Sequence, residues 1–317
     1  MNTLILSTDG MGGTILQRLI TILYHLEQVK IINIWDMLNG GLQVNSKKKL
    51  IKVWPEGGTL DYSQSLAEIE TILKNADNNV KIVSRLSKWH LDDRKDEASE
   101  KINFYNFCKK FYDKHIICIR KNLFEHAMSL SIRNKSTVSN IIYRNDRNKV
   151  LAVEEVDEDY FIEMCQKYIN YHNWVDKHFP NAIKIYYEDL ITNADQVLKS
   201  LTGYTDTFKN YFGTELSVLL QKEYDFSNSL ITGIPMQLSK QEQLALIKYK
   251  TTTKDMAERK MVGVYVPVKN TTLTDKKKQI KNFDQCLNKF HLFAKNHNWI
   301  DQSNATYDFW NKKELTN

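Results

Sequence analysis

The residues with the clearest chemical potential are the glycines of a short turn near the N-terminus. Residues 7–14 read Ser-Thr-Asp-Gly-Met-Gly-Gly-Thr and follow an apolar run at residues 3–6. From Ile15 onward, apolar residues recur at helical spacing, so a strand, a glycine turn and a helix are expected in succession. Backbone N–H groups in such a turn converge on one point, and the start of the helix adds partial positive charge. The turn therefore predicts a phosphate site formed by Gly10, Met11, Gly12, Gly13 and Thr14.

This turn differs from both familiar nucleotide loops. A Walker A loop has a lysine before its hydroxyl residue, whereas Gly13 precedes Thr14 here. The third glycine of G-x-G-x-x-G is also missing. A turn that only packs the helix closely against the sheet is the structural alternative to a phosphate site.

A second candidate is the segment Arg-Leu-Ser-Lys-Trp-His-Leu at residues 85–91, which follows a predicted strand at residues 80–83. Ligands bind at the carboxyl ends of strands in open α/β sheets. Lys88 and His90 are two residues apart, so their side chains point the same way from an extended segment. Such a lysine can hold a transferring anionic group while the histidine removes a proton from an attacking group. The alternative is an exposed basic loop.

The third candidate follows a predicted strand at residues 115–119. Arg120 and Lys121 place two cations at the end of that strand, and Ser129 lies in the helix expected after it. This grouping suggests a second phosphate site, and cations held in surface ion pairs are the alternative. A fourth segment, Tyr-Glu-Asp-Leu at residues 187–190, follows a predicted strand at residues 183–187, and we expect it to have a structural role.

These segments lie between apolar runs typical of strands buried in a parallel sheet. Strands are predicted at residues 3–6, 29–35, 80–83, 115–119 and 183–187. Helical patterns are predicted to separate them, at residues 15–26, 65–73, 97–112, about 122–132 and 160–179. The pattern predicts an α/β domain over residues 1–194, a three-layer sandwich with a central, mostly parallel five-stranded sheet. Residues 195–317 show helical patterns without obvious strands, so we expect a helical C-terminal subdomain.

Composition narrows the classes of partner. The 317 residues include 44 basic and 38 acidic side chains, and the net charge of +6 does not by itself indicate nucleic acid binding. The sequence has no apolar run long enough to cross a membrane and no leader-like N-terminus, so a cytoplasmic protein without a membrane partner is expected. No Cys-x-x-Cys pair occurs, so we expect neither a metal site nor a disulfide framework. The four cysteines, expected to be reduced and buried, are Cys108, Cys118, Cys165 and Cys286.

The order of the four candidate segments resembles the sulfotransferase superfamily over about residues 1–192. The family's P-K-S-G-T-T-W-L signature aligns with residues 9–16, and its R-L-x-K-T-H-L segment aligns with residues 85–91. Its L-R-R-N-P-x-x-x-A-x-S segment aligns without a gap with residues 119–129, and Y-E-D-L is present literally at residues 187–190. The resemblance implies a P-loop-like fold and a sulfuryl donor, 3′-phosphoadenosine 5′-phosphosulfate, as co-substrate.

The resemblance also implies roles for individual residues. The turn Gly10–Thr14 would cradle the 5′-phosphosulfate, while Arg120, Lys121 and Ser129 would bind the 3′-phosphate. Lys88 would contact the sulfuryl group, and His90 would act as the general base toward a hydroxyl or amine of a small molecule or glycan. No metal is implied.

One departure keeps other functions open. The family has a basic residue in the first loop where Gly10 stands, and Asp9 beside it adds a negative charge. At an effective dielectric near 20, a carboxylate about 4 Å from an anion costs about 4 kcal/mol. A catalytically degenerate relative with a structural or protein-interaction role is therefore the main alternative. A kinase-like NTPase is a third hypothesis, weakened by the absent Walker lysine.

Overall fold

The computed structural model describes residues 2–8, 10–34, 58–60, 66–87, 98–135, 155–232, 236–258, 277 and 280–297. The chain forms two compact units, each of which is described by itself. The first unit comprises Met1–Ile119, Val175–Lys222 and Leu238–Tyr265, and the second comprises Arg120–Trp174, Glu223–Gln237 and Val266–Asn317. The boundary expected between residues 194 and 195 falls at the start of helix α9 (Ala194–Thr202), inside the first unit.

The first unit contains a six-stranded sheet in the order β3-β2-β4-β1-β5-β6. Its strands are β1 (Thr3–Ser7), β2 (Ile31–Ile34), β3 (Gly58–Leu60), β4 (Lys81–Ser87), β5 (Lys114–Ile119) and β6 (Ile183–Tyr186). Each neighbouring pair is parallel, which confirms the expected α/β class. The five expected strands are all present, and β3, which was not predicted, extends the sheet at the edge next to β2.

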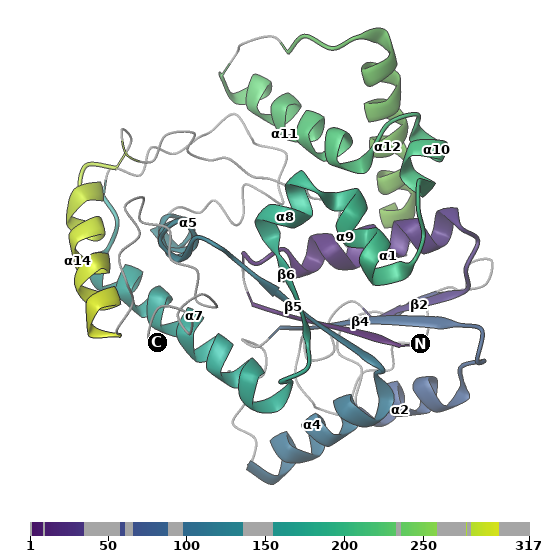
Figure 1. Ribbon diagram of the computed structural model, residues 1–317, viewed down its shortest axis with the longest axis horizontal. Coiled ribbons are helices and arrows are strands. Elements are labelled where there is room, and N and C mark those ends of the chain that lie inside the picture. The colour runs from purple at the N-terminus through teal and green to yellow at the C-terminus, as the bar shows by residue number, and fades with distance from the viewer. Residues whose placement is uncertain are drawn as a thin grey trace. The chain divides into compact units, whose positions relative to one another are not determined.

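Helices cover both faces of this sheet, as the three-layer prediction requires (Figure 1). On one face lie α1 (Gly13–Leu26), α8 (Tyr187–Thr192), α9 and α10 (Thr207–Phe212), and on the other lie α2 (Leu66–Asn75) and α4 (Ala98–Phe111). Strand β1 is buried throughout and β5 over its last four residues, as expected where both faces are covered, whereas the first two residues of the edge strand β6 are exposed. A buried hydrogen bond from the Tyr112 hydroxyl to Ser84 Oγ, at 2.6 Å, satisfies a polar side chain of the central strand β4.

Strand β4 extends further than the sequence suggested. Its ladder with β1 pairs Ile5 with Arg85 and continues to Ser7 opposite Ser87. Arg85 and Ser87 therefore belong to the strand and do not lie in the segment after it. The polar residues had concealed this continuation, because a buried strand is expected to read as an apolar run.

The second unit is organised around an aromatic cluster. It includes α5 (Leu123–Lys135), most of α7 (Glu158–His178) and α14 (Phe283–Asn296). The ring of Phe124 on α5 packs edge-on against Phe161, Phe283 and Phe290, with centroid separations of 5.4, 5.3 and 5.4 Å. These contacts join segments far apart in the sequence into one core.

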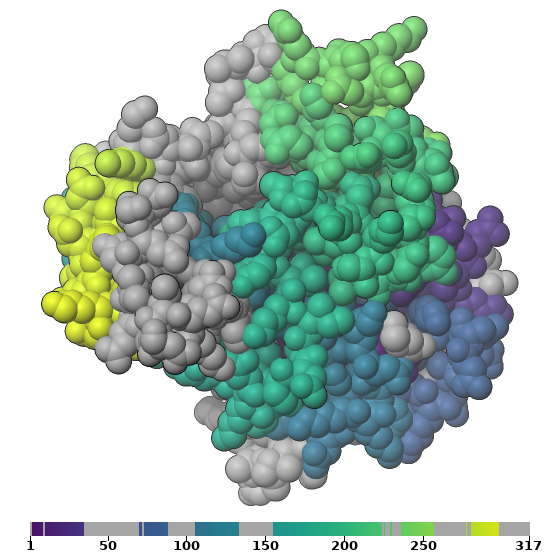
Figure 2. All heavy atoms as spheres, viewed as in Figure 1, coloured from purple at the N-terminus to yellow at the C-terminus, as the bar shows by residue number. Residues whose placement is uncertain are grey.

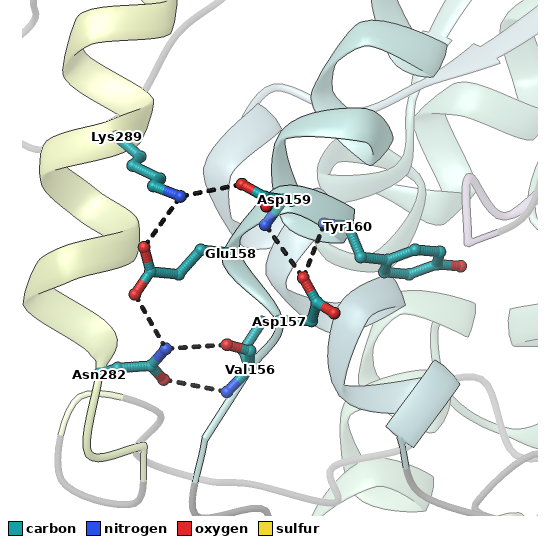
Figure 3. Close-up of polar contacts among 7 residues, drawn as sticks. All are labelled: Val156, Asp157, Glu158, Asp159, Tyr160, Asn282 and Lys289. Atoms are coloured by element: carbon teal, nitrogen blue, oxygen red, sulfur yellow. Dashed lines mark hydrogen bonds and ion pairs between the residues drawn. The ribbon is translucent and has the colours of Figure 1, made fainter.

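A polar clasp fastens α14 to the start of α7 in the second unit (Figure 3). The side-chain amide of Asn282 accepts the N–H of Val156 at 2.9 Å and donates to its carbonyl at 2.8 Å. Lys289 reaches from α14 to Glu158 and Asp159, with N–O distances of 3.1 and 3.0 Å.

The described residues after β6 form helices and no strand, in line with the helical character expected there. Besides α9, α10 and α14 they include α11 (Leu216–Thr232) and α12 (Lys240–Glu258). Within the described residues, no helix is both long and apolar enough to span a bilayer.

Candidate functional site

The glycine turn has the predicted strand–turn–helix geometry. Gly10 and Gly12 have φ angles of 73° and 83°, in the left-handed region that glycine adopts without strain. Gly12 is the N-cap of α1, and its carbonyl accepts the N–H of Leu16 at 2.9 Å. The N–H groups of Gly13 and Thr14 therefore lie in the first turn, where a helix offers them no internal partner. Such N–H groups attract an anion.

One glycine of the turn, Gly13, also has a packing role. A Cβ atom at Gly13 would collide with the Ser7 hydroxyl, so glycine lets α1 approach the end of β1 closely. Close packing of the helix against the sheet, the alternative to a phosphate site, thus explains the glycine at position 13. It does not explain the left-handed conformation of Gly10, which precedes the helix.

Tyr187 also belongs to this turn. A Cβ built on Gly12 would lie 2.6 Å from Tyr187 Cδ2, so the tyrosine ring lies directly against the N-cap of α1. Tyr187 begins α8 immediately after β6 and is partly exposed. The Tyr-Glu-Asp-Leu segment had been expected to be structural, and the first residue of that segment is now found beside the glycine turn. Its literal match to the sulfotransferase pattern was the available sequence signal.

A cation reaches the turn from the neighbouring strand. Arg85 Nη1 donates to the Thr14 hydroxyl, and Arg85 Cδ lies 3.5 Å from the position of a Cβ on Gly13. The guanidinium thus lies at the N-terminus of α1, where residue 10 supplies no charge. Sequence reasoning assigned no role to Arg85, although Arg85 begins the second candidate segment. Its role depends on the register that pairs it with Ile5.

The four cysteines are unreactive at neutral pH. Burial raises the pKa of Cys118 on β5 to about 12, against the opposing effect of the nearby Arg85 charge. Burial likewise raises the pKa of Cys108 and Cys165. All four cysteines are free and buried, as expected. Their thiols stay protonated at neutral pH, and the described residues contain no group of side chains suited to holding a metal ion.

The two residues predicted to do the chemistry, Lys88 and His90, lie outside the described residues, as does Asp9. Strand β4 ends at Ser87, so Lys88 directly follows the strand in the chain. Their roles remain predictions.

The residues predicted to bind a second phosphate lie in the second unit. Arg120 and Lys121 are partly exposed and precede α5, whose first turn is capped by Asn122 through a 2.9 Å bond from the Glu125 N–H to Asn122 Oδ1. Ser129 is exposed, and its hydroxyl donates to the Glu125 carbonyl at 2.8 Å. The structure therefore gathers Gly12, Gly13, Thr14, Arg85 and Tyr187 in the first unit. In the second unit, Arg120 and Lys121 directly precede α5, and Ser129 lies in the middle of that helix.

Comparison with known proteins places few constraints on this site. No protein-family model matches the chain, and no curated protein sequence matches it. A crystal structure of retinol dehydratase in complex with androsterone and the inactive cofactor PAP aligns with 93% of this chain and 80% of its own, at 13% identity and a TM-score of 0.37. A likeness this low assigns no activity to the chain.

Proposed function

We propose that this protein is a sulfotransferase that takes its sulfuryl group from 3′-phosphoadenosine 5′-phosphosulfate. The observation that carries the proposal is the Arg85 guanidinium bonded to Thr14 at the N-terminus of α1, beside the left-handed glycine turn. The N-terminus of this helix brings together a cation, a hydroxyl and helix-terminal N–H groups. Together these groups can bind the phosphate of a nucleotide.

The glycine turn would bind the 5′-phosphosulfate. The N–H groups of Gly13 and Thr14 lie in the first turn of α1, and Arg85 adds a full positive charge next to them. The charge of Arg85 can replace that of the basic residue which the family has at the position of Gly10. The ring of Tyr187 bounds the turn at Gly12 and offers an aromatic surface to a nucleotide.

The 3′-phosphate would be bound by Arg120, Lys121 and Ser129. Arginine can bind a phosphate with two parallel N–H bonds, whereas lysine acts as a point charge. The 3′-phosphate is what distinguishes this donor from ordinary adenine nucleotides, so these cations would determine donor specificity.

Transfer would be carried out by Lys88 and His90 without a metal. His90 accepts the proton of the attacking hydroxyl or amine, whose oxygen or nitrogen forms the new bond to sulfur. Lys88 stabilises the oxygens of the sulfuryl group during transfer. As the bond between sulfur and the bridging oxygen breaks, the turn N–H groups and Arg85 stabilise the charge on the departing 5′-phosphate, and adenosine 3′,5′-bisphosphate is released.

Calorimetry with adenosine 3′,5′-bisphosphate tests the proposal. Wild-type protein should bind it, and Lys121→Ala should weaken binding, whereas Lys199→Ala, at an exposed lysine of α9, should not. Absence of binding at millimolar concentration would overturn the proposal.

The second candidate is a degenerate relative with a structural or interaction role. It is motivated by the uncharged Gly10 and by the packing of Gly13 against Ser7, which explains part of the turn without a ligand. This candidate predicts that the wild-type protein binds no adenosine 3′,5′-bisphosphate and that His90→Ala changes neither stability nor partner binding.

A further inference from the structure

A buried tyrosine supports the backbone at the proposed 3′-phosphate site. Tyr168 on α7 is 3% exposed. Its hydroxyl accepts the N–H of Arg120 at 3.2 Å and donates to the carbonyl of the same residue at 2.5 Å. One side chain thus satisfies both backbone polar groups of Arg120.

Arg120 needs such a partner because of its place in the chain. It is the first residue after β5, so its backbone has left the sheet, and it precedes α5, so it has not entered the helix. Backbone groups that are removed from water must find hydrogen-bond partners. Tyr168 supplies these at one end of the Arg120–Asn122 turn, and the Asn122 cap to Glu125 fixes the other.

The tyrosine is itself held in place by two buried histidines. Its ring meets His126 edge-on, with centroids 5.4 Å apart, and lies 4.3 Å from the ring of His172. His126 and His172 are 2% and 0% exposed. This packing fixes the ring in the core of the second unit, and it thereby fixes the hydroxyl beside the backbone of Arg120.

We propose that Tyr168 is a positioning residue for the 3′-phosphate of the donor. The inference rests on the proposed function and deepens it. By fixing the backbone of Arg120, Tyr168 holds the stems of Arg120 and Lys121 in the orientation that presents both charges to one phosphate. Binding then orders fewer degrees of freedom, because the turn is already organised.

A positioning role and a purely structural role of Tyr168 predict different effects on nucleotide binding. A tyrosine that only stabilises the second unit would affect every nucleotide alike. A tyrosine that positions the cations at Arg120 and Lys121 affects a nucleotide only through its 3′-phosphate.

The test compares adenosine 3′,5′-bisphosphate with adenosine 5′-monophosphate, which lacks the 3′-phosphate, by calorimetry. Tyr168→Phe removes the hydroxyl and keeps the ring, and it should weaken binding of the bisphosphate by about fivefold to tenfold while leaving the monophosphate unchanged. Tyr171→Phe is the matched control, since Tyr171 is a buried tyrosine of the same helix whose ring packs against His172 and Trp174. It should change neither affinity.

Two further variants keep the test decisive. Asn122→Ala frees the other end of the turn and should produce the same selective loss. In a Lys121→Ala background, Tyr168→Phe should have a smaller effect than in wild type, because the two side chains act on one phosphate.

Wild-type affinity for the bisphosphate in both Tyr168→Phe and Asn122→Ala would overturn the inference and leave the proposed function standing. Equal losses for the two nucleotides would overturn it in the same way. If the wild-type protein binds neither nucleotide, the proposed function fails, and the inference fails with it.

Discussion

The ring of Tyr187 occupies the space that a side chain on Gly12 would need. A Cβ atom at Gly12 would lie 2.6 Å from Tyr187 Cδ2, and Gly12 has a φ angle of +83°. Strand β5 lies between the strands that precede these two residues, so the contact joins the ends of β1 and β6 across the sheet. Glycine is required at position 12 for two independent reasons, its conformation and its neighbour.

Gly12→Ala should destabilise the protein by more than a positive φ angle alone can explain. The left-handed conformation costs alanine about 1–2 kcal/mol, and displacement of a packed ring adds about 1–3 kcal/mol. Gly203→Ala is the matched control, because Gly203 has a φ angle of +80° and no atom within 4 Å of its Cβ position. Urea unfolding should show the larger loss for Gly12→Ala, and equal losses would contradict the packing of Tyr187 against the turn.

Arg85→Gln should weaken the binding of adenosine 3′,5′-bisphosphate by about tenfold to a hundredfold. This is the range expected when a charge-assisted hydrogen bond worth about 1.5–3 kcal/mol is lost. Arg85→Lys should fall between this variant and wild type, because it keeps the charge and loses the planar fork. Calorimetry at two salt concentrations should show a smaller salt dependence for Arg85→Gln.

Lys199→Gln provides the control for loss of a positive charge in the same unit, since Lys199 is exposed on α9. Its affinity should equal that of wild type. Unchanged binding in Arg85→Gln would show that the cation at the turn does not act on the ligand.

The sequence predicted the sheet well where hydrophobic patterning was unambiguous. Strands β1 and β5 read as unbroken apolar runs and lie within about one residue of the expected bounds. Strand β3 has three residues and begins with a glycine, too short for any periodicity to show. The end of β4 was missed because Arg85 and Ser87 are polar.

The contribution of Arg85 to the site could not be read from sequence for a related reason. It requires knowing that Arg85 pairs with Ile5, and that register is set by sheet pairing between residues far apart in the chain. The grouping of α5, α7 and α14 around Phe124 is equally non-local. Local patterns predicted candidate site residues, whereas the contact of Arg85 with the turn depends on long-range packing.

Stability should fall as the pH rises above about 9, in part because of Cys118. The ordinary pKa of its thiol is 9.0, and burial raises the pKa in the folded protein to about 12. Between these two values the unfolded chain loses the thiol proton while the folded protein keeps it. The folded state then binds more protons than the unfolded state, so increasing pH favours unfolding.

Comparison of wild type with Cys118→Ala isolates this effect from other groups that titrate at high pH. Urea midpoints measured from pH 7 to pH 10.5 should fall less steeply in the variant, although its stability at pH 7 is lower because a buried side chain is truncated. Parallel curves for the two proteins would show that the Cys118 thiol ionises equally in both states.

Asn282→Ala removes only a small side chain, but it should markedly lower the free energy of unfolding of the second unit. The amide of Asn282 both donates to and accepts from the backbone of Val156, a residue only 2% exposed (Figure 3). Alanine would leave a partly buried N–H and carbonyl without these partners, at about 1–3 kcal/mol for each unsatisfied group. A loss of about 2–4 kcal/mol is therefore expected in urea unfolding.

Lys289→Ala is the comparison within the same clasp. Hydrogen bonds to Asp159 and Glu158 raise the pKa of Lys289. The ion pairs are exposed to solvent, with side-chain exposures of 42% for the lysine and 95% for Asp159. Helix α14, which carries Lys289, is yellow in Figure 2. Exposed ion pairs add little to stability, so this variant should unfold close to wild type. A larger loss in Lys289→Ala than in Asn282→Ala would mean that charge, and not backbone satisfaction, fastens α14 to the start of α7.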